Sequence, residues 1–236
     1  MPTTAEKLDT SGIRTADLCR HYEIGGNVVR AVDGVSLEIE SGEFAALLGT
    51  SGSGKSTLLG LLAGMDSPTS GSVTVHGTDL AGLSRNQLAG YRLRTAGMIF
   101  QAFNLIASMT LLENVELPMR FAGVDRKQRE QLARESLQRV GLGDRMSHRP
   151  RELSGGQQQR GAIARAIINH PKILFADEPT GNLDSRTGME IMELIRDLNQ
   201  TEKTTVMMVT HERHLADRYA GRMLFMADGK LVDERQ

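Results

Sequence analysis

The chain of 236 residues contains a single cysteine, Cys19. No disulfide can therefore form within the chain, which fits a protein of a reducing compartment. No recognisable motif surrounds Cys19. We therefore do not expect a catalytic thiol at this position.

Long apolar runs are also absent from the sequence. Residues 1–18 (MPTTAEKLDTSGIRTADL) have no apolar core of the kind that a secretory leader carries. Nowhere do about 18 apolar residues follow one another, as a membrane-spanning helix requires. The apolar clusters, such as residues 44–49 and 205–209, are short. We therefore expect a chain that does not cross a membrane by itself.

The chain has no excess of either charge, because 28 lysines and arginines face 29 acidic residues and the net charge is -1. The bulk positive charge that holds many proteins on nucleic acid is missing, so no nucleic-acid partner is expected. The composition, with 39% hydrophobic and 24% charged residues, is typical of a folded protein.

Short β-type runs recur along the chain, and several are wholly apolar, as strands buried on both faces are. Helical patterns lie between them at residues 56–63, 186–199 and 212–219. This alternation predicts an α/β fold with a mostly parallel sheet. The β-type runs span residues 35–39, 44–48, 73–75, 98–100, 173–176, 205–209 and 222–226.

The middle of the chain differs, because about residues 103–169 carry little strand signal. Within it, residues 125–140 place Leu132, Leu137 and Val140 near one face of a helix. We predict a single domain over residues 1–236. In it, a core of about residues 1–102 and 166–236 carries a helical subdomain at about residues 103–165.

A phosphate-binding loop is indicated by GTSGSGKST at residues 49–57, which follows an apolar run and opens a helix. Gly49, Gly52 and Gly54 let the backbone curl and bring its N–H groups close to a polyphosphate. The helix that follows points its positive end to the same place. Lys55 is expected to reach the outer phosphates, and the Ser56 hydroxyl can bind Mg²⁺.

Two acids end the apolar run ILFADEP at residues 173–179. The carboxyl end of a parallel strand is where open α/β sheets bind ligands. We predict that Asp177 belongs to the Mg²⁺ shell and that Glu178 takes a proton from the attacking water. Gln101 and His211 also follow apolar runs, so both can face the phosphates from strand ends.

The string LSGGQQQR at residues 153–160 offers a second phosphate-binding helix start. Ser154 can donate its hydroxyl, and the bare backbones of Gly155 and Gly156 allow close approach of an anion. A triphosphate enclosed by the first loop has little room for a second helix of the same chain. We therefore predict that this segment faces a nucleotide held by a second copy, in a two-fold dimer with two ATPs.

The order GTSGSGKST, Gln101, LSGGQ, ILFADEP, NLD (residues 182–184) and His211 resembles the ATP-binding cassette (ABC) ATPase family over nearly the whole chain. The resemblance implies ATP hydrolysis on a P-loop NTPase fold, with a RecA-like core, an antiparallel β subdomain and an inserted helical subdomain. It implies that the phosphates are held by Gly49, Thr50, Ser51, Gly52, Ser53, Gly54, Lys55, Ser56 and Thr57.

Further roles are implied by the same resemblance. Tyr22 would stack on adenine, and Gln101 would touch Mg²⁺ and the attacking water and sense the membrane partner. His211 would contact the γ-phosphate, and Asp184 would lie in the loop at the dimer interface. The signature that faces the partner's ATP would be Ser154, Gly155, Gly156 and Gln157.

Residues 100–119, 148–167 and 176–185 resemble the branch that includes lipoprotein-release, macrolide-export and cell-division ATPases. In that branch the cassette is often a separate chain, which implies an integral membrane permease as partner. The cassette would then lie in the cytoplasm, peripheral on the inner face of the membrane. Two departures from the family pattern are Thr50, where proline is commonest, and Gly161, where a branched apolar residue is usual. A helix-interior glycine costs about 1 kcal/mol relative to alanine, so Gly161 is expected to soften its helix.

Two alternatives stay open at the level of sequence. One is a regulatory cassette that signals through a membrane partner without any cargo. The other is a soluble ABC protein acting on ribosomes or DNA. Members of that class carry two cassettes or a long coiled-coil insertion, whereas this chain has one uninterrupted cassette and no basic excess. The sequence does not identify a cargo, the membrane partner or the direction of transport.

Overall fold

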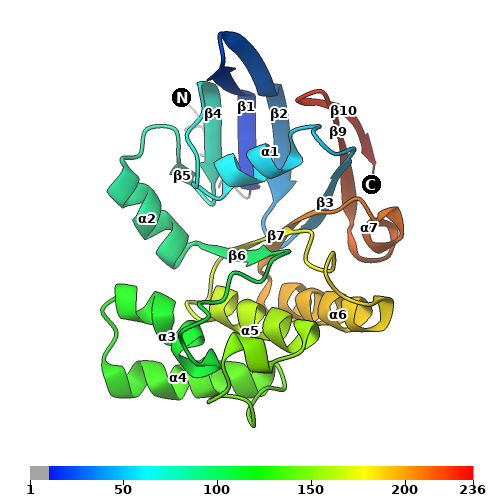
Figure 1. The fold of residues 1–236 in the computed structure, drawn as a ribbon. Coiled ribbons are helices and arrows are strands. Elements are labelled where there is room, and N and C mark those ends of the chain that lie inside the picture. Colours follow the sequence, from blue (N-terminus) through cyan, green and yellow to red (C-terminus); the bar gives the residue numbers. More distant parts are fainter. Residues whose placement is uncertain (1–10, 236) are drawn as a thin grey trace, which may run out of the picture.

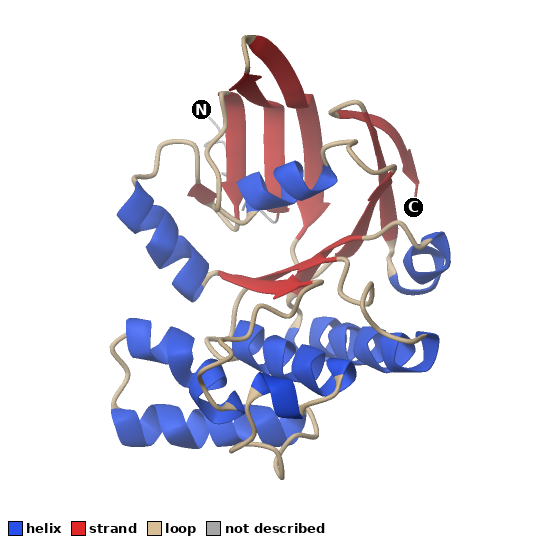
Figure 2. Cartoon of the chain, in the orientation of Figure 1, coloured by secondary structure: helices blue, strands red, loops and turns tan. Residues whose placement is uncertain are grey.

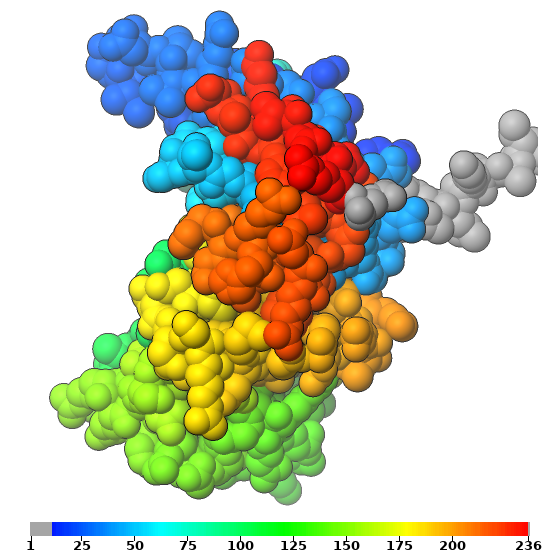
Figure 3. Space-filling view, turned by 90° about the vertical axis from the view of Figure 1, so that its right-hand side faces the viewer, coloured from blue at the N-terminus to red at the C-terminus, as the bar shows by residue number. Residues whose placement is uncertain are grey.

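The computed structural model describes residues 11–235 (Figure 1). Residues 1–10 lie outside the described part. They belong to the segment 1–18, in which no secretory leader is expected. Helix α1 (Lys55–Leu62) lies between two β-sheets, and a layer of helices covers the far face of the larger sheet (Figure 2). Figure 3 shows the N-terminal β region (blue) and the helical region (green) at opposite ends, with C-terminal segments between them.

The smaller sheet is antiparallel, in the order β2-β1-β4-β5. Its long hairpin turns at Gly25 and Gly26, whose φ angles of 57° and 82° suit glycine. Register shifts interrupt the pairing of the two hairpin strands, so the hairpin is bent rather than flat. The strands are β1 (Ser11–Ile24), β2 (Asn27–Glu40), β4 (Ser70–Val75) and β5 (Thr78–Asp79).

The larger sheet has the order β10-β9-β3-β8-β7-β6 and is parallel except for β10. Strands β3, β7 and β8 are buried almost throughout because both of their faces are covered. The predicted α/β class, with a mostly parallel sheet and a separate antiparallel sheet, is confirmed. The strands are β3 (Phe44–Gly49), β6 (Ala96–Phe100), β7 (Ile173–Asp177), β8 (Thr205–Val209), β9 (Arg222–Ala227) and β10 (Lys230–Arg235).

Two buried clusters hold the larger sheet between its neighbours. One joins α1 and the antiparallel sheet to one face of the larger sheet, around residues such as Leu58 and Phe175. The other packs helices onto the opposite face, around residues such as Ile191 and Met208. The helices outside the middle region, besides α1, are α2 (Arg85–Arg94), α6 (Ser185–Glu202) and α7 (Arg213–Tyr219).

Between β6 and β7 the chain forms α3 (Leu111–Phe121), α4 (Arg126–Arg139), a short 3-10 turn (Pro150–Glu152) and α5 (Gly155–Ile167). A third buried cluster belongs to this region. The subdomain division at residues 103–165 stays a prediction, which this separate cluster supports. Within residues 11–235, no helix has both the length and the apolar character that spanning a membrane requires.

Gly161, which we expected only to soften its helix, has a packing role. A Cβ atom at this position would lie 2.4 Å from Cδ1 of the fully buried Leu111. The missing side chain therefore lets α3 approach α5 closely.

The topology brings the carboxyl ends of the parallel strands to one edge of the larger sheet. Strands β6, β7 and β8 end in register, since Phe100 pairs with Asp177 and Asp177 with Val209. The residues that follow these ends therefore share an edge with the loop after β3. This edge carries most of the predicted site.

Candidate active site

The loop between β3 and α1 depends on glycine at two places. Gly52 and Gly54 have left-handed φ angles of 79° and 100°. A Cβ atom on Gly54 would also lie 2.0 Å from the Ala31 carbonyl oxygen. No side chain caps the N-terminus of α1, so the N–H groups of its first turn are available to an anion.

Lys55 is buried within this loop. Its ammonium donates hydrogen bonds to the carbonyl oxygens of Gly49 and Thr50, both at 2.8 Å. Thr50 itself is exposed and contributes to this contact through its backbone. Threonine in place of the common proline therefore leaves the lysine anchor intact.

The loop opens onto a cavity of about 670 Å³. Glu178 and His211 line the cavity together with the loop. The lining residues at 29–31 and 228–229 were not identified from the sequence, because they are ordinary strand and turn residues that no motif marks. The lining residues are Val29, Arg30, Ala31, Ser51, Gly52, Gly54, Lys55, Ser56, Thr57, Glu178, His211, Asp228 and Gly229.

The two adjacent acids point to different partners. Asp177, the last residue of β7, accepts a hydrogen bond from the Ser56 hydroxyl at 3.4 Å. Burial, and then the negative charge of Glu178, raise the pKa of Asp177. Glu178 adopts a left-handed φ of 45°, and its Oε1 lies 3.2 Å from Nδ1 of His211. The sharp turn thus directs one carboxylate to the loop and the other to the histidine.

Gln101 follows β6 as predicted but does not line the cavity. Its Nε2 lies 3.4 Å from Oδ1 of Asn182, and the Asn182 amide donates to the Gln101 carbonyl at 2.9 Å. The side chain is therefore tied to the loop after Glu178, next to the acids rather than among the cavity walls. Its predicted contact with Mg²⁺ stays a prediction.

Tyr22 also lies outside the set of residues that line the cavity. Its hydroxyl donates to Asp66 Oδ2 at 2.7 Å, and the Arg20 guanidinium lies 4.5 Å from the ring centre. The hydroxyl and the ring of Tyr22 are therefore both in contact with residues of its own chain, Asp66 and Arg20. Stacking on adenine stays a prediction for this residue.

The signature segment begins α5 away from these cavity walls. Ser154 is exposed and caps the helix, with its Oγ accepting from the Gln157 N–H and its own N–H donating to Gln157 Oε1. Glycine is required at residue 156 for a packing reason that we did not predict. A Cβ atom added there would lie 2.4 Å from Cγ2 of Thr187. Gly155 similarly packs near Leu183. The glycines thus serve packing within the chain, whatever they do for an anion.

Gln159 and Asp184 connect the signature region to its surroundings. Gln159 is fully buried, and its amide donates to the carbonyl oxygens of Pro179 at 2.6 Å and Phe100 at 3.4 Å. This link was not predicted, because the glutamine run by itself indicates only the start of a helix. Asp184 caps α6 by accepting from the Thr187 N–H, and hydrogen bonds from Thr187 hold the pKa of its carboxyl below the usual range.

Comparison with known protein families shows which family the chain belongs to. The family model described as ABC transporter matches residues 32–181. The chain belongs to the ABC transporter family. It is an ATP-hydrolysing cassette of that family, and the predicted P-loop NTPase fold and ATP binding are thereby confirmed.

Individual relatives agree with this assignment. An uncharacterized ABC transporter ATP-binding protein of Methanocaldococcus jannaschii is 47% identical over 94% of the cassette and 98% of its own length. The macrolide export ATP-binding/permease protein MacB of Brucella melitensis is 45% identical over 94% of the cassette. The match covers only 34% of that longer protein. These relatives confirm the resemblance to the macrolide-export branch.

Solved structures show the same fold. A dimeric ATP-binding cassette in a post-hydrolysis state, bound to ADP and Pi, superposes with a TM-score of 0.88 at 39% identity. It covers 95% of the cassette and 98% of the compared chain. A second dimeric structure of that same cassette, described as a bacterial ABC transporter cassette, gives the same TM-score at 41% identity and the same coverage.

Gly54→Ala is expected to weaken ATP binding, because the new Cβ would meet the Ala31 carbonyl at a left-handed backbone angle. Such strain costs about 1–3 kcal/mol. At 1.4 kcal/mol per decade, that corresponds to about 5- to 150-fold weaker binding in a nucleotide titration. The matched control is Gly60→Ala inside α1, where a Cβ would meet nothing within 4 Å. Equal affinity in both variants would contradict the steric role of Gly54.

Proposed function

We propose that the cassette is the ATPase subunit of an ABC transporter, in which two copies enclose two ATPs and drive a separate integral membrane permease. One observation carries the shared-site proposal. The phosphate loop, Glu178 and His211 line one cavity, whereas the signature start at Ser154 is exposed and outside it. Each chain therefore offers two separate parts of a site. Both solved structures of the similar cassette are dimeric, which supports the same arrangement.

Within each site, the phosphates of ATP rest on the N–H groups of the loop and of the α1 start, beside the Lys55 ammonium. Glu178 is placed to accept the proton of the attacking water. His211 lies 3.2 Å from the Glu178 carboxylate and orients it. Because both line the cavity, neither needs a large movement to reach the terminal phosphate.

The residues beside the loop also fit a Mg²⁺ ion. Ser56 and Asp177 already lie 3.4 Å apart, and a hydroxyl with a carboxylate is a usual ligand set for this cation. The raised pKa of Asp177 reflects burial and the neighbouring Glu178 charge, which a cation would relieve. Bound there with Gln101 nearby, Mg²⁺ would neutralise charge on the phosphates.

The signature of the second copy completes each site in this proposal. The Ser154 oxygen accepts from Gln157 N–H, which leaves its hydroxyl hydrogen free to donate to a phosphate oxygen. The N-terminus of α5 adds the positive end of its helix dipole. Gln159 then links α5 to the carbonyl of Pro179, the residue after Glu178. Movement of the signature would therefore shift the backbone next to Glu178.

A second cavity, of about 330 Å³, is proposed to receive the cytoplasmic segment of the membrane subunit. It lies between the α2–β6 region and the helical region, with Met65, Met98, Pro118 and Arg165 among its walls. The half-buried Arg165 donates to the carbonyls of Phe103 and Asn104, two and three residues after Gln101. A segment seated there would press on the loop that holds Gln101. The cassette would then be peripheral on the cytoplasmic face of the membrane.

Glu178→Gln is expected to bind ATP normally but to hydrolyse it about 10²–10⁴-fold more slowly, the usual effect of losing a general base. That corresponds to about 3–5 kcal/mol of transition-state stabilisation. Glu190→Gln is the control, since this exposed acid does not line the cavity. Both rates are measured as phosphate release at saturating ATP. Normal turnover of Glu178→Gln would remove this residue from the mechanism.

Ser154→Arg is expected to leave ATP binding to the single chain nearly intact but to abolish ATP-dependent dimerisation and hydrolysis. Light scattering with and without ATP measures the dimer. Ser154→Ala separates the capping role, because losing the cap alone costs about 1 kcal/mol of stability. An arginine variant that dimerises and turns over like the wild type would refute the shared site.

Met65→Glu is expected to abolish association with the membrane subunit while leaving the basal ATPase rate unchanged. Met65 is 48% exposed at the second cavity, so a charge there disturbs docking more than folding. Val232→Glu is the control, because Val232 is 62% exposed and outside that cavity. The measurement is cross-linking in detergent-solubilised native membranes, followed by identification of the captured permease. Equal capture by both variants would contradict this docking site.

A further inference from the structure

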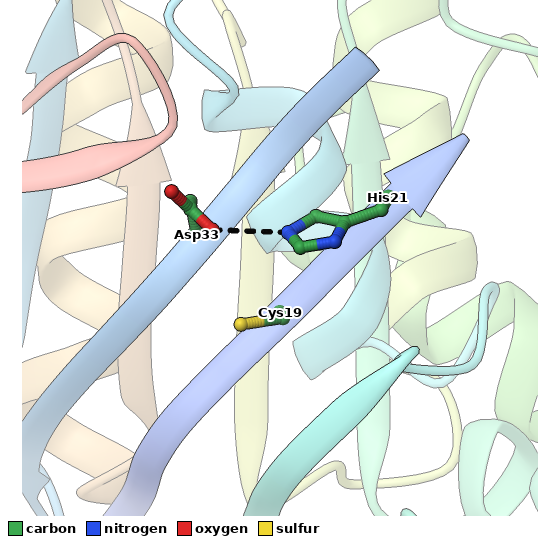
Figure 4. A group of neighbouring side chains, drawn as sticks. All are labelled: Cys19, His21 and Asp33. Carbon is green, nitrogen blue, oxygen red and sulfur yellow. Dashed lines mark hydrogen bonds and ion pairs between the residues drawn. The ribbon is translucent and has the colours of Figure 1, made fainter. Parts of the chain in front are cut away.

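We propose that Cys19, His21 and Asp33 form a binding site for a borderline-soft divalent cation, with zinc as the fitting example. Cys19 and His21 lie two residues apart on β1, and Asp33 lies on the neighbouring strand β2. Figure 4 shows the three side chains gathered at this hairpin, with the histidine ring directed at the carboxylate. None of the three lines the nucleotide cavity.

The spacing of the ligand atoms fits a small metal ion. One atom from each residue can be chosen so that all three lie within 4.8 Å of one another. In a tetrahedral zinc site with bonds of about 2.0–2.3 Å, neighbouring ligand atoms lie about 3.3–3.6 Å apart. His21 Nε2 and Asp33 Oδ1 are already 3.0 Å apart, so these two ligands need little rearrangement.

The chemistry of the set is that of zinc ligands: a thiolate, an imidazole and a carboxylate. The Gly34 N–H donates to Cys19 Sγ at 3.2 Å, which holds the sulfur against β2. The thiol hydrogen, directed at the Asp17 carbonyl 3.5 Å away, would leave as a proton when the metal binds.

The surroundings hold the ligands in place without blocking the ion. The Asp33 N–H donates to the Gly229 carbonyl at 2.8 Å, and the hairpin pairs His21 with Arg30. Lys230 approaches the other carboxylate oxygen, Oδ2, at 3.7 Å, which leaves Oδ1 to the metal. Within residues 11–235 the group has three members, so water would fill the fourth position of a tetrahedral ion. Such a site binds an exchangeable ion rather than a permanent structural one.

The test uses the untagged full chain, stripped of metal and held in excess Mg²⁺. Calorimetric titration with Zn²⁺ is expected to give one ion per chain. Co²⁺ is expected to give the ultraviolet band of a thiolate–cobalt bond. Cys19→Ser, His21→Gln and Asp33→Asn should each weaken Zn²⁺ binding by at least about tenfold, the smallest loss usual even for outer-shell changes.

His214→Gln is the matched control, because His214 pairs with Glu212 elsewhere on the surface and should bind Zn²⁺ like the wild type. Circular dichroism of each variant reports that it is folded. Absence of Zn²⁺ binding to the wild type would overturn the proposal. Loss confined to Cys19→Ser, with full binding in the other two variants, would indicate a lone reactive thiol and would overturn it equally.

Discussion

The nucleotide site depends on a contact between three backbone segments, at residues 30–33, 53–54 and 229, which meet without side chains between them. The Gly229 N–H donates to the Ser53 carbonyl at 3.1 Å, while the Gly229 carbonyl accepts from Asp33 N–H. Gly54 abuts the Ala31 carbonyl, and a Cβ on Gly229 would lie 2.6 Å from the Arg30 carbonyl. The antiparallel sheet, the phosphate loop and the β9–β10 turn are thereby held in one place. Ala31, Gly54 and Gly229, which form this contact, also line the cavity together with Glu178.

Around this contact, the site is built from strand ends and helix starts. The parallel sheet delivers Asp177, Glu178 and His211 to one edge, where the left-handed turn at Glu178 separates the two acids. The helical region connects to that edge through the buried amide of Gln159. A buried amide with its carbonyl partners moves as a unit, because breaking those hydrogen bonds leaves polar groups unpaired. The catalytic edge and the signature helix are therefore expected to respond to each other.

The sequence predicted the parts of the fold whose pattern is local. The wholly apolar runs became β3, β7 and β8, and the glycine motif became the loop before α1. Strand β1 was missed because bulges and half-exposed residues break its alternation. The cavity wall at residues 29–31 and the Gln159 link were missed for another reason: they arise from contacts between distant segments. Tyr22 shows the same limit, since its partner Asp66 carries no motif, and the motif that contains Asn182 gave no sign of its contact with Gln101.

Two separate reasons require that Gly156 have no side chain. Its bare backbone was predicted to admit an anion, yet the structure shows that a Cβ would collide with Cγ2 of Thr187 at 2.4 Å. An alanine at residue 156 would therefore displace α6 from α5 whether or not a nucleotide ever touches it. If Thr187 were first replaced by serine, which has no such methyl group, the collision with Cγ2 would be removed. A remaining effect of alanine at residue 156 on ATP binding could then be assigned to its contact with the nucleotide. Residues 156 and 187 are in this sense a compensating pair, so substitutions at the two positions are expected to be tolerated jointly more often than singly.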